Sequence, residues 1–327
     1  MVSQLQPFRL LLFALLAAFT SVLVSLLSGS VELSFDDLIA YAVGDIPALQ
    51  RQILEEIRFP RTLAAFVTGA ALALAGVLMQ VLLRNPLADP YILGLSGGAA
   101  VGALASIMLG LGGWWLSGTA FVGALVSVGV VFGIASRSGR WSTTHLLLTG
   151  VVVSAGWGAL INLMLSTSAS ASVQGMLFWL MGDLSQSRVG LLQVGILITG
   201  AALALRAARS LNVLVRGDLV AASLGVHVNG LRLSLFFGAS LLTVIAVTTA
   251  GSVGFVGLVV PHMLRLTGAR DHRLLIPFSL IAGGTFLVVA DTLARTLLAP
   301  QQLPVGVITA LIGVPSFIVI LRNAASK

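Results

Sequence analysis

The sequence predicts an all-α, polytopic membrane protein. Three observations predict this class: 57% of the residues are hydrophobic, only 9% are charged, and apolar stretches recur from one end of the chain to the other. An average soluble domain is about 25% charged, so a soluble protein of this size could not cover its surface with so few ionised side chains. Stretches of about 20 apolar residues are long enough to cross a hydrocarbon core of about 30 Å. A β-barrel would instead show alternating segments of about ten residues.

The apolar stretches define about ten transmembrane helices. They are predicted at residues 8–28, 62–83, 91–112, 114–136, 144–166, 189–207, 231–250, 253–266, 274–297 and 305–321. The eighth is short and contains Pro261. Residues 173–181 are apolar but too few to span, which predicts a half-inserted or interfacial helix. We treat residues 1–327 as one transmembrane domain.

The distribution of basic residues predicts that both termini are cytoplasmic. With the N-terminus inside, only Arg51, Arg58, Arg61, Arg188 and Arg295 lie outside, and the other 13 of the 18 basic residues lie in cytoplasmic segments. Cytoplasmic loops carry an excess of lysine and arginine, so this orientation is favoured. The basic residues are scattered between the apolar stretches, which does not suggest nucleic-acid binding.

Two segments between the spans carry helix signals. Outside, residues 29–60 are acidic, and Ser34 followed by two aspartates is typical of a helix N-cap. Inside, residues 218–228 predict a short helix with Gly225 as its C-cap. That inner helix is too polar to span, and it is either a docking element or an ordinary connecting loop.

Charged residues at the outer ends of spans allow two interpretations. Arg58 and Arg61 lie three residues apart and share one face of a helix start, and Arg295 lies at the outer end of its span. The three either extend to the interface as ordinary long side chains or form a docking surface for carboxylates at an exposed rim. Asp291 and Arg295 are spaced as an intrahelical ion pair, although a role in proton transfer is the alternative.

Several classes of chemistry are excluded or disfavoured by the composition. The chain has no cysteine, and its only lysine is Lys327, so it contains no G-x-x-x-x-G-K-[ST] phosphate loop. If ATP drives the protein, another chain must bind it. The histidines show no metal-ligand spacing, and we expect no metal, no cofactor and no catalytic residues. Ser96 between glycines, together with His262, allows an intramembrane serine protease as a distant alternative.

Six segments together resemble the FecCD-type permease family, the membrane subunits of type II ABC importers for iron–siderophore, haem and cobalamin. They are Arg-Phe-Pro-Arg-Thr-Leu at 58–63, the Gly/Ala-rich stretch 69–80, Asn-Pro-Leu-Ala-Asp-Pro at 85–90, and residues 254–265, 271–273 and 303–309. The motifs are closest to those of the cobalamin-importing members. The resemblance implies a multi-pass permease of the cell inner membrane, with two permease subunits around a central pathway. It also implies two cytoplasmic ABC ATPase subunits and a periplasmic or surface-anchored binding protein as partners.

The resemblance also assigns roles to individual positions. Arg58, Arg61 and Arg295 match arginines that receive acidic residues of the binding protein. The segment at about 208–230 matches the region that couples to the ATPase, in particular at Asp218, Ala221, Leu224, Gly225 and Val226. Positions near the cytoplasmic gate are matched by Asn85, Leu87, Ser142 and Thr143, although His145 departs from the family pattern there. The sequence leaves open which chelate is carried and whether the second permease subunit is identical. An ion-coupled secondary transporter is the rival function, but the middle of this chain is nearly free of charges.

Overall fold

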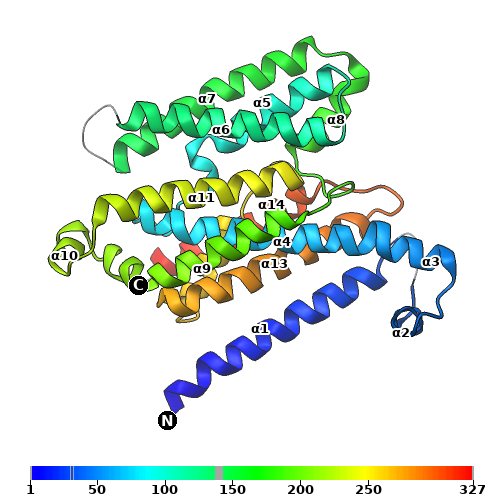
Figure 1. The fold of residues 1–327 in the computed structure, drawn as a ribbon, viewed down its shortest axis with the longest axis horizontal. Helices are drawn as coiled ribbons and strands as arrows, with labels where there is room; N and C mark the ends of the chain where they lie inside the picture. The colour runs from blue at the N-terminus through cyan, green and yellow to red at the C-terminus, as the bar shows by residue number, and fades with distance from the viewer. Residues whose placement is uncertain (1, 30, 32, 137–142, 326–327) are drawn as a thin grey trace.

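The computed structural model describes residues 2–29, 31, 33–136 and 143–325, and every regular element among these residues is helical. The long helices run in roughly the same direction and form three groups (Figure 1). The helices α4, α9, α11, α13 and α14 form the middle of the molecule, α5 to α8 form a second group on one side, and α1 lies along the opposite edge. The described ends of the chain lie at the same end of the bundle as α10, as an even number of spans requires.

Seven helices in the described part of the chain are long and apolar enough to cross a membrane. They are α1 (Val2–Leu27), α4 (Phe59–Leu82, which continues the helical run from Ala48), α6 (Trp114–Ser136), α7 (Thr143–Thr167), α9 (Leu191–Leu214), α11 (Val228–Ala250) and α13 (His272–Thr296). Three shorter apolar helices occupy the remaining predicted spans: α5 (Leu95–Met108), α12 (Val256–Leu266) and α14 (Val305–Ala325). The predicted all-α polytopic fold is confirmed.

The helix α4 forms the core of the molecule. Nearly all of its residues are buried, because α9, α11, α12 and α13 pack around it. Glycines allow this close packing: a Cβ atom on Gly76 would overlap the carbonyl group of Gly257 in α12, and one on Gly69 would overlap that of Gly283 in α13. Small residues at helix crossings let membrane helices approach closely, so the glycine-rich composition has a direct structural use here.

The outer segment before α4 is helical over most of its length. The helix α2 (Phe35–Val43) begins at the predicted N-cap, where the Ser34 hydroxyl accepts a hydrogen bond from the backbone of Asp37 at 3.2 Å. Next come α3 (Ala48–Gln52) and the π-helical turn η1 (Ile53–Arg58), which leads without a break into α4. A small separate core of Leu33, Ile46 and Leu54 holds this outer lobe together.

Some predicted boundaries are wrong because local backbone features interrupt the spans. The span at 91–112 begins as a 3₁₀ turn, η2 (Pro90–Leu93), and α5 starts only after Gly94, whose φ is +73°. The span at 253–266 starts at Val256 because Phe255 before it has a φ of +70°. Within residues 218–228, α10 covers Asp218–Ser223 with Leu224 as its C-cap, so the helix ends one residue before the predicted cap Gly225, which has a φ of +79°.

The predicted half-inserted segment is a helix, α8 (Ser170–Leu180), which packs against α5. A non-helical stretch from Met181 to Gly190 then leads to α9. The helix α9 continues to Leu214, seven residues beyond the predicted end of its span, into the segment expected to be cytoplasmic.

Candidate functional site

The three outer arginines come from different elements and meet at one cavity. Arg58 ends η1, Arg61 lies in the first turn of α4, and Arg295 lies in the last turn of α13. All three line a cavity of about 120 Å³, together with Gln302 and residues of the loop after α1. The structure therefore brings together the three positions that the sequence predicted as a group.

Asp291 is the central anion of this group. The Nε and Nη2 atoms of Arg61 donate hydrogen bonds to its carboxylate at 2.8–3.0 Å, and Nε of Arg295 lies 3.7 Å from its second oxygen. The predicted pairing of Asp291 with Arg295 is confirmed, but Arg61 makes the shorter and more extensive contact. Arg61 also donates to the side-chain oxygen of Gln302 at 2.8 Å, through Nη1.

Arg58 and Arg295 hold the outer end of α1. Arg58 donates hydrogen bonds to the carbonyl groups of Leu26, Leu27 and Val31, the second of these at 2.8 Å. Arg295 donates to the carbonyl of Ser28 at 3.0 Å and to the hydroxyl of Ser25 at 2.7 Å. The last carbonyl groups of a helix have no partner within the helix, so these arginines act as a cap that joins α1 to α4 and α13.

The three arginines are buried, which corrects the expectation that they lie exposed at a rim. Only 2% of Arg58, 7% of Arg61 and 9% of Arg295 is exposed. Their guanidinium groups donate to the protein and do not extend to the interface as the alternative interpretation required. A partner could reach them only through the cavity, and their contact with a binding protein stays a prediction.

At the cytoplasmic end, the short helix α10 is fixed by an acidic residue in its first turn. Both carboxylate oxygens of Asp218 accept hydrogen bonds from Nη2 of Arg232 in α11, at 2.8 Å. Nη2 of Arg84, in the loop after α4, lies 3.5 Å from Asp218. Of the other predicted coupling positions, Ala221 is fully buried and Val226 packs partly against the core.

The opposite face of α10 is apolar and exposed. Leu219 is 88% exposed and Leu224 is 66% exposed, and Val220 between them is 42% exposed. Of these three residues, only Leu224 was predicted from the sequence as a coupling position. Leu219 was missed because its exposure depends on which face Asp218 and Ala221 turn toward the bundle, and a six-residue helix has too few turns to show a period.

The loop after α4 holds the first two predicted gate positions. The side chain of Asn85 accepts a hydrogen bond from the backbone of Leu87 at 2.9 Å, and its own backbone donates to the Gln80 carbonyl at 3.1 Å. Asp89 accepts from the backbone of Tyr91 at 2.8 Å, and burial raises the pKa of Asp89 to about 6. The loop is thus held by its own side chains.

The other two gate positions lie at the start of α7. Thr143 is the first residue of that helix, whereas Ser142 lies outside the described residues. The helix α7 packs against η2 at Gly150, where a Cβ atom would overlap the carbonyl of Ile92. The helix α7 is therefore a neighbour of η2, which directly follows the loop at residues 84–89 (the gate loop), and the gating role of the four positions stays a prediction.

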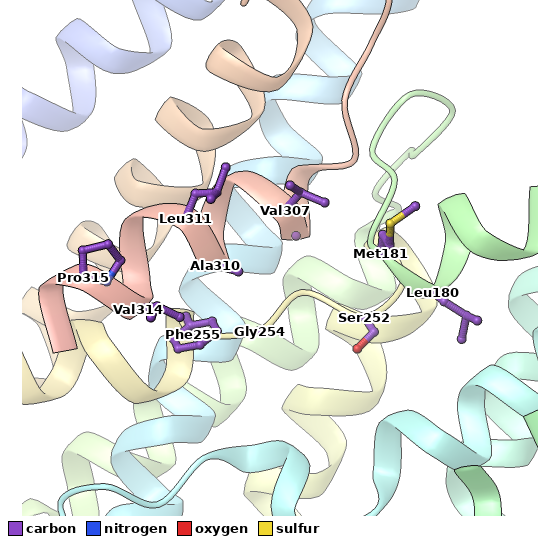
Figure 2. Close-up of a pocket in the computed structure, with 11 residues that line it drawn as sticks. Leu180, Met181, Ser252, Gly254, Phe255, Val307, Ala310, Leu311, Val314 and Pro315 are labelled. Atoms are coloured by element: carbon purple, nitrogen blue, oxygen red, sulfur yellow. The ribbon is translucent and has the colours of Figure 1, made fainter. Parts of the chain in front are cut away.

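An apolar cavity of about 590 Å³ opens between the end of α8, the linker from α11 to α12, and α14 (Figure 2). Its lining includes Leu180 and Met181 from the end of α8, and Ser252 and Phe255 from the linker. Irregular backbone at membrane depth is tolerated where it is buried in protein or lines a cavity. The two non-helical stretches that meet here fit that condition.

The protease alternative gains no support from the described part of the chain. There, no hydrogen bond joins Ser96 to His262, and the His262 ring packs against Phe317 with ring centroids 6.3 Å apart. No group of three or more histidine, aspartate or glutamate side chains suited to a metal occurs among the residues that the structure describes.

The helical bundle, with a basic cavity at one end and an exposed apolar helix at the other, defines a multi-pass α-helical membrane protein. The profile of the FecCD transport family matches residues 14–323. The chain therefore belongs to the FecCD transport family.

Its relatives include characterised and structurally solved transporters. It is 42% identical over 294 residues to the cobalamin import system permease protein BtuC of Halobacterium salinarum, a match that covers 87% of this chain and 78% of the relative. It is 38% identical over 342 residues to the hemin transport system permease protein HmuU of Yersinia pestis, covering 99% and 98%. Among solved structures, an inward-facing metal-chelate type ABC transporter matches with a TM-score of 0.86 and 30% identity, over 96% of this chain and 99% of that one.

Proposed function

We propose that this chain is the permease subunit of an ATP-driven importer, in the cytoplasmic membrane, that moves a bulky metal chelate inward. The membership of the FecCD family and the similarity to permeases named for cobalamin and hemin support this class of cargo. An ion-coupled secondary transporter is disfavoured by the same findings. It is also disfavoured by Asp291, whose charge is already balanced by Arg61 and Arg295 at the outer end of the bundle.

The observation that carries the proposal is the exposed apolar face of α10. Leu219 and Leu224 are exposed, whereas Asp218 on the opposite face of α10 binds Arg232 of α11 and holds the helix against the bundle. Exposed apolar surface at one place on a membrane protein's aqueous face marks a site of protein contact. Because the chain has no phosphate loop, a separate ABC ATPase subunit that receives this face would supply the ATP hydrolysis.

A second permease subunit completes the pathway in this proposal. The centre of a single copy is filled by α4, whose side chains are almost wholly buried, so one chain offers no passage through its middle. An open apolar cavity lies beside α14 (Figure 2). We place the pathway between two permease subunits, with a second copy or a paralogue on the other side.

The outer arginine cavity is the proposed contact with a substrate-binding protein. Three guanidinium groups line the cavity, and one carboxylate, Asp291, pairs with two of them, Arg61 and Arg295, so the cavity carries an excess of positive charge. An acidic side chain from the partner would enter the cavity and bind through charge-assisted hydrogen bonds. No bond in the cargo is made or broken, and the chain needs no cofactor for this role.

Transport would follow from rigid-body motion of the two permease subunits. Closure of the ATPase pair displaces α10, and the displacement changes which side of the membrane the pathway faces. Binding-protein docking at the opposite end releases the cargo into the outward-open pathway.

The test is reconstitution in proteoliposomes with the partner ATPase inside and the binding protein outside. Radiolabelled cyanocobalamin and haemin are the probes, and we expect ATP-dependent accumulation of one of them, with none when the ATPase is omitted. The permease alone should hydrolyse no ATP. Hydrolysis by this chain alone, or accumulation driven by an ion gradient without ATP, would overturn the assignment.

A further inference from the structure

Arg84, Asp218 and Arg232 form a charged cluster that joins three separate segments at the cytoplasmic end. Asp218 belongs to α10, Arg232 to the first turns of α11, and Arg84 to the loop that leads from α4 to the gate positions. No sequence pattern indicates that these residues are in contact, because Arg84 and Asp218 are far apart in the chain.

The two ion pairs of this cluster differ in kind. Arg232 has a buried side chain and binds both oxygens of Asp218 at 2.8 Å. Arg84 is 36% exposed, Asp218 is 38% exposed, and their closest atoms are 3.5 Å apart. The first pair is short, has two hydrogen bonds and has one buried partner, Arg232, so it fixes α10 to α11. The second is long and solvated, and such surface pairs contribute little to stability, so the fold does not depend on it.

The backbone around the second pair is nevertheless arranged to allow it. Arg84 has a φ of +48°, and besides Phe255 it is the only residue other than glycine with a positive φ in the described part of the chain. Gly217, the residue before α10, has a φ of +120°, and the Nη1 atom of Arg84 lies 3.9 Å from where a Cβ on Gly217 would be. An unfavourable backbone conformation in a residue that could be glycine points to a function of its side chain.

Arg84 is directly continuous with the gate loop. The next residue, Asn85, donates its backbone N–H to the Gln80 carbonyl at 3.1 Å and holds the backbone of Leu87 with its side chain. The side chain of Gln80 in turn donates to the carbonyl groups of Gly257 and Leu258 in α12 at 3.3 Å. Arg84 is therefore joined to the loop through Asn85, at an end of α4 that also contacts α12 through Gln80.

We propose that Arg84 is a positioning residue that transmits the displacement of α10 to the gate loop through its ion pair with Asp218. When the ATPase moves α10, Asp218 moves with it, and the Arg84 guanidinium pulls on the residue that precedes Asn85. The inference rests on the proposed function, because it requires α10 to be the segment that the ATPase moves.

Three substitutions at one position separate the side chain from the backbone. Arg84→Ala removes the charge and keeps a side chain at a position with a positive φ. Arg84→Gly also removes the charge, and because glycine adopts a positive φ readily, it removes the unfavourable backbone conformation as well. Arg84→Lys keeps the charge. Arg270→Ala is the matched control, since Arg270 is exposed on the same membrane face and its side chain has no ion pair with the described residues.

The measurements use the full complex of permease, ATPase and binding protein in proteoliposomes. The first is the amount of cyanocobalamin or haemin taken up per ATP hydrolysed. The second, which needs no chelate, is the stimulation of ATP hydrolysis by the binding protein. We expect Arg84→Ala and Arg84→Gly to lower both by about fivefold or more, a typical size for coupling between two sites, while the ATPase still co-purifies in normal amount. Arg84→Lys should retain most of both, and Arg270→Ala should match the unmodified complex.

The outcomes distinguish this inference from the proposed function. If the unmodified complex shows neither uptake nor stimulation, the proposed function fails and this inference fails with it. If the unmodified complex works and both Arg84→Ala and Arg84→Gly keep its ratios, Arg84 does not transmit the motion and only this inference fails. Normal ratios in Arg84→Gly with low ratios in Arg84→Ala would assign the effect to the backbone and would also overturn it.

Discussion

The two ends of this molecule hold their charged groups in opposite ways. At the outer end, Arg58, Arg61 and Arg295 are buried and every guanidinium donates to the protein, with Asp291 at the centre. At the opposite end, α10 is held by one short ion pair whose aspartate is partly exposed, and Leu219 and Leu224 are exposed. The outer cluster joins α1, α4 and α13, whereas α10 is a short helix on the surface.

The difference shows which groups can serve a partner without damage to the fold. A buried charge that loses its counter-charge destabilises the protein strongly, whereas an exposed apolar side chain on a fixed helix can change with little effect on stability. We therefore expect substitutions at the outer end to affect folding first and those at α10 to affect assembly first. The following three predictions test that separation.

The largest expected effect is on stability, from Asp291→Ala. Asp291 is 1% exposed and is the anion between Arg61 and Arg295, so its removal leaves two buried guanidinium groups without their counter-charge. We expect a loss of about 3–5 kcal/mol, measured by thermal unfolding of the detergent-solubilised protein. Asp45→Ala, at an exposed carboxylate of the same outer lobe, is the control and should leave the melting temperature unchanged. An unchanged melting temperature in Asp291→Ala would show that the cluster is not a structural joint.

An intermediate effect is expected on assembly, from Leu219→Asp and Leu224→Asp. Both side chains are exposed in the isolated chain, so the substitutions should leave its melting temperature nearly unchanged. In the complex, each aspartate would be buried at the centre of the contact between α10 and the ATPase subunit. We therefore expect the affinity for the ATPase to fall by about 30-fold, which corresponds to a hot-spot loss of about 2 kcal/mol. Co-purification and equilibrium binding measure this. Leu266→Asp, at an exposed leucine in the last turn of α12, is the control, and normal ATPase binding by both α10 variants would exclude this helix as the contact.

The smallest expected effect is on binding-protein affinity, from Gln302→Glu. Gln302 lines the arginine cavity and already accepts from Arg61, so a carboxylate there fills the cavity with an anion and does not disturb the buried Asp291. We expect about tenfold weaker binding at low salt, and a smaller loss at high salt because exposed charges are screened. Gln301→Glu places the same charge on the neighbouring residue, which does not line the cavity, and should have little effect. Equal affinities of the two variants would contradict docking through the cavity.

Most of the fold could be predicted from the sequence, because the bilayer imposes a length on each apolar stretch. Each of the ten predicted stretches contains a helix in the structure. The errors lie where one residue overrides the apolar pattern, as at Phe255 and Gly94, whose positive φ values delay the starts of α12 and α5. Such conformations leave no mark in an average of hydropathy, so the pattern alone could not show them.

The candidate site was predicted less completely, because its contacts join distant parts of the chain. The spacing of Asp291 and Arg295 is visible in the sequence as one helical turn, but the contact between Arg61 and Asp291 depends on how α4 packs against α13. The same reason explains why Leu219 and Arg84 were missed. The burial of the outer arginines could not be predicted from the sequence either, because arginines at the ends of membrane spans normally extend to the membrane–water interface.

The continuous helical run from Ala48 through the π-turn into α4 determines how far the outer segment with α2 and α3 projects from the bundle. It contains 35 residues, and at about 1.5 Å per residue it is about 50 Å long, compared with a hydrocarbon core of about 30 Å. The inner end of the run stops at the gate loop, so most of the extra length stands outside the membrane. The segment of α2 and α3 therefore projects beyond the outer end of the bundle (Figure 1). If a binding protein docks at the arginine cavity as proposed, its shape must leave room for this projection before its carboxylates can reach the arginines.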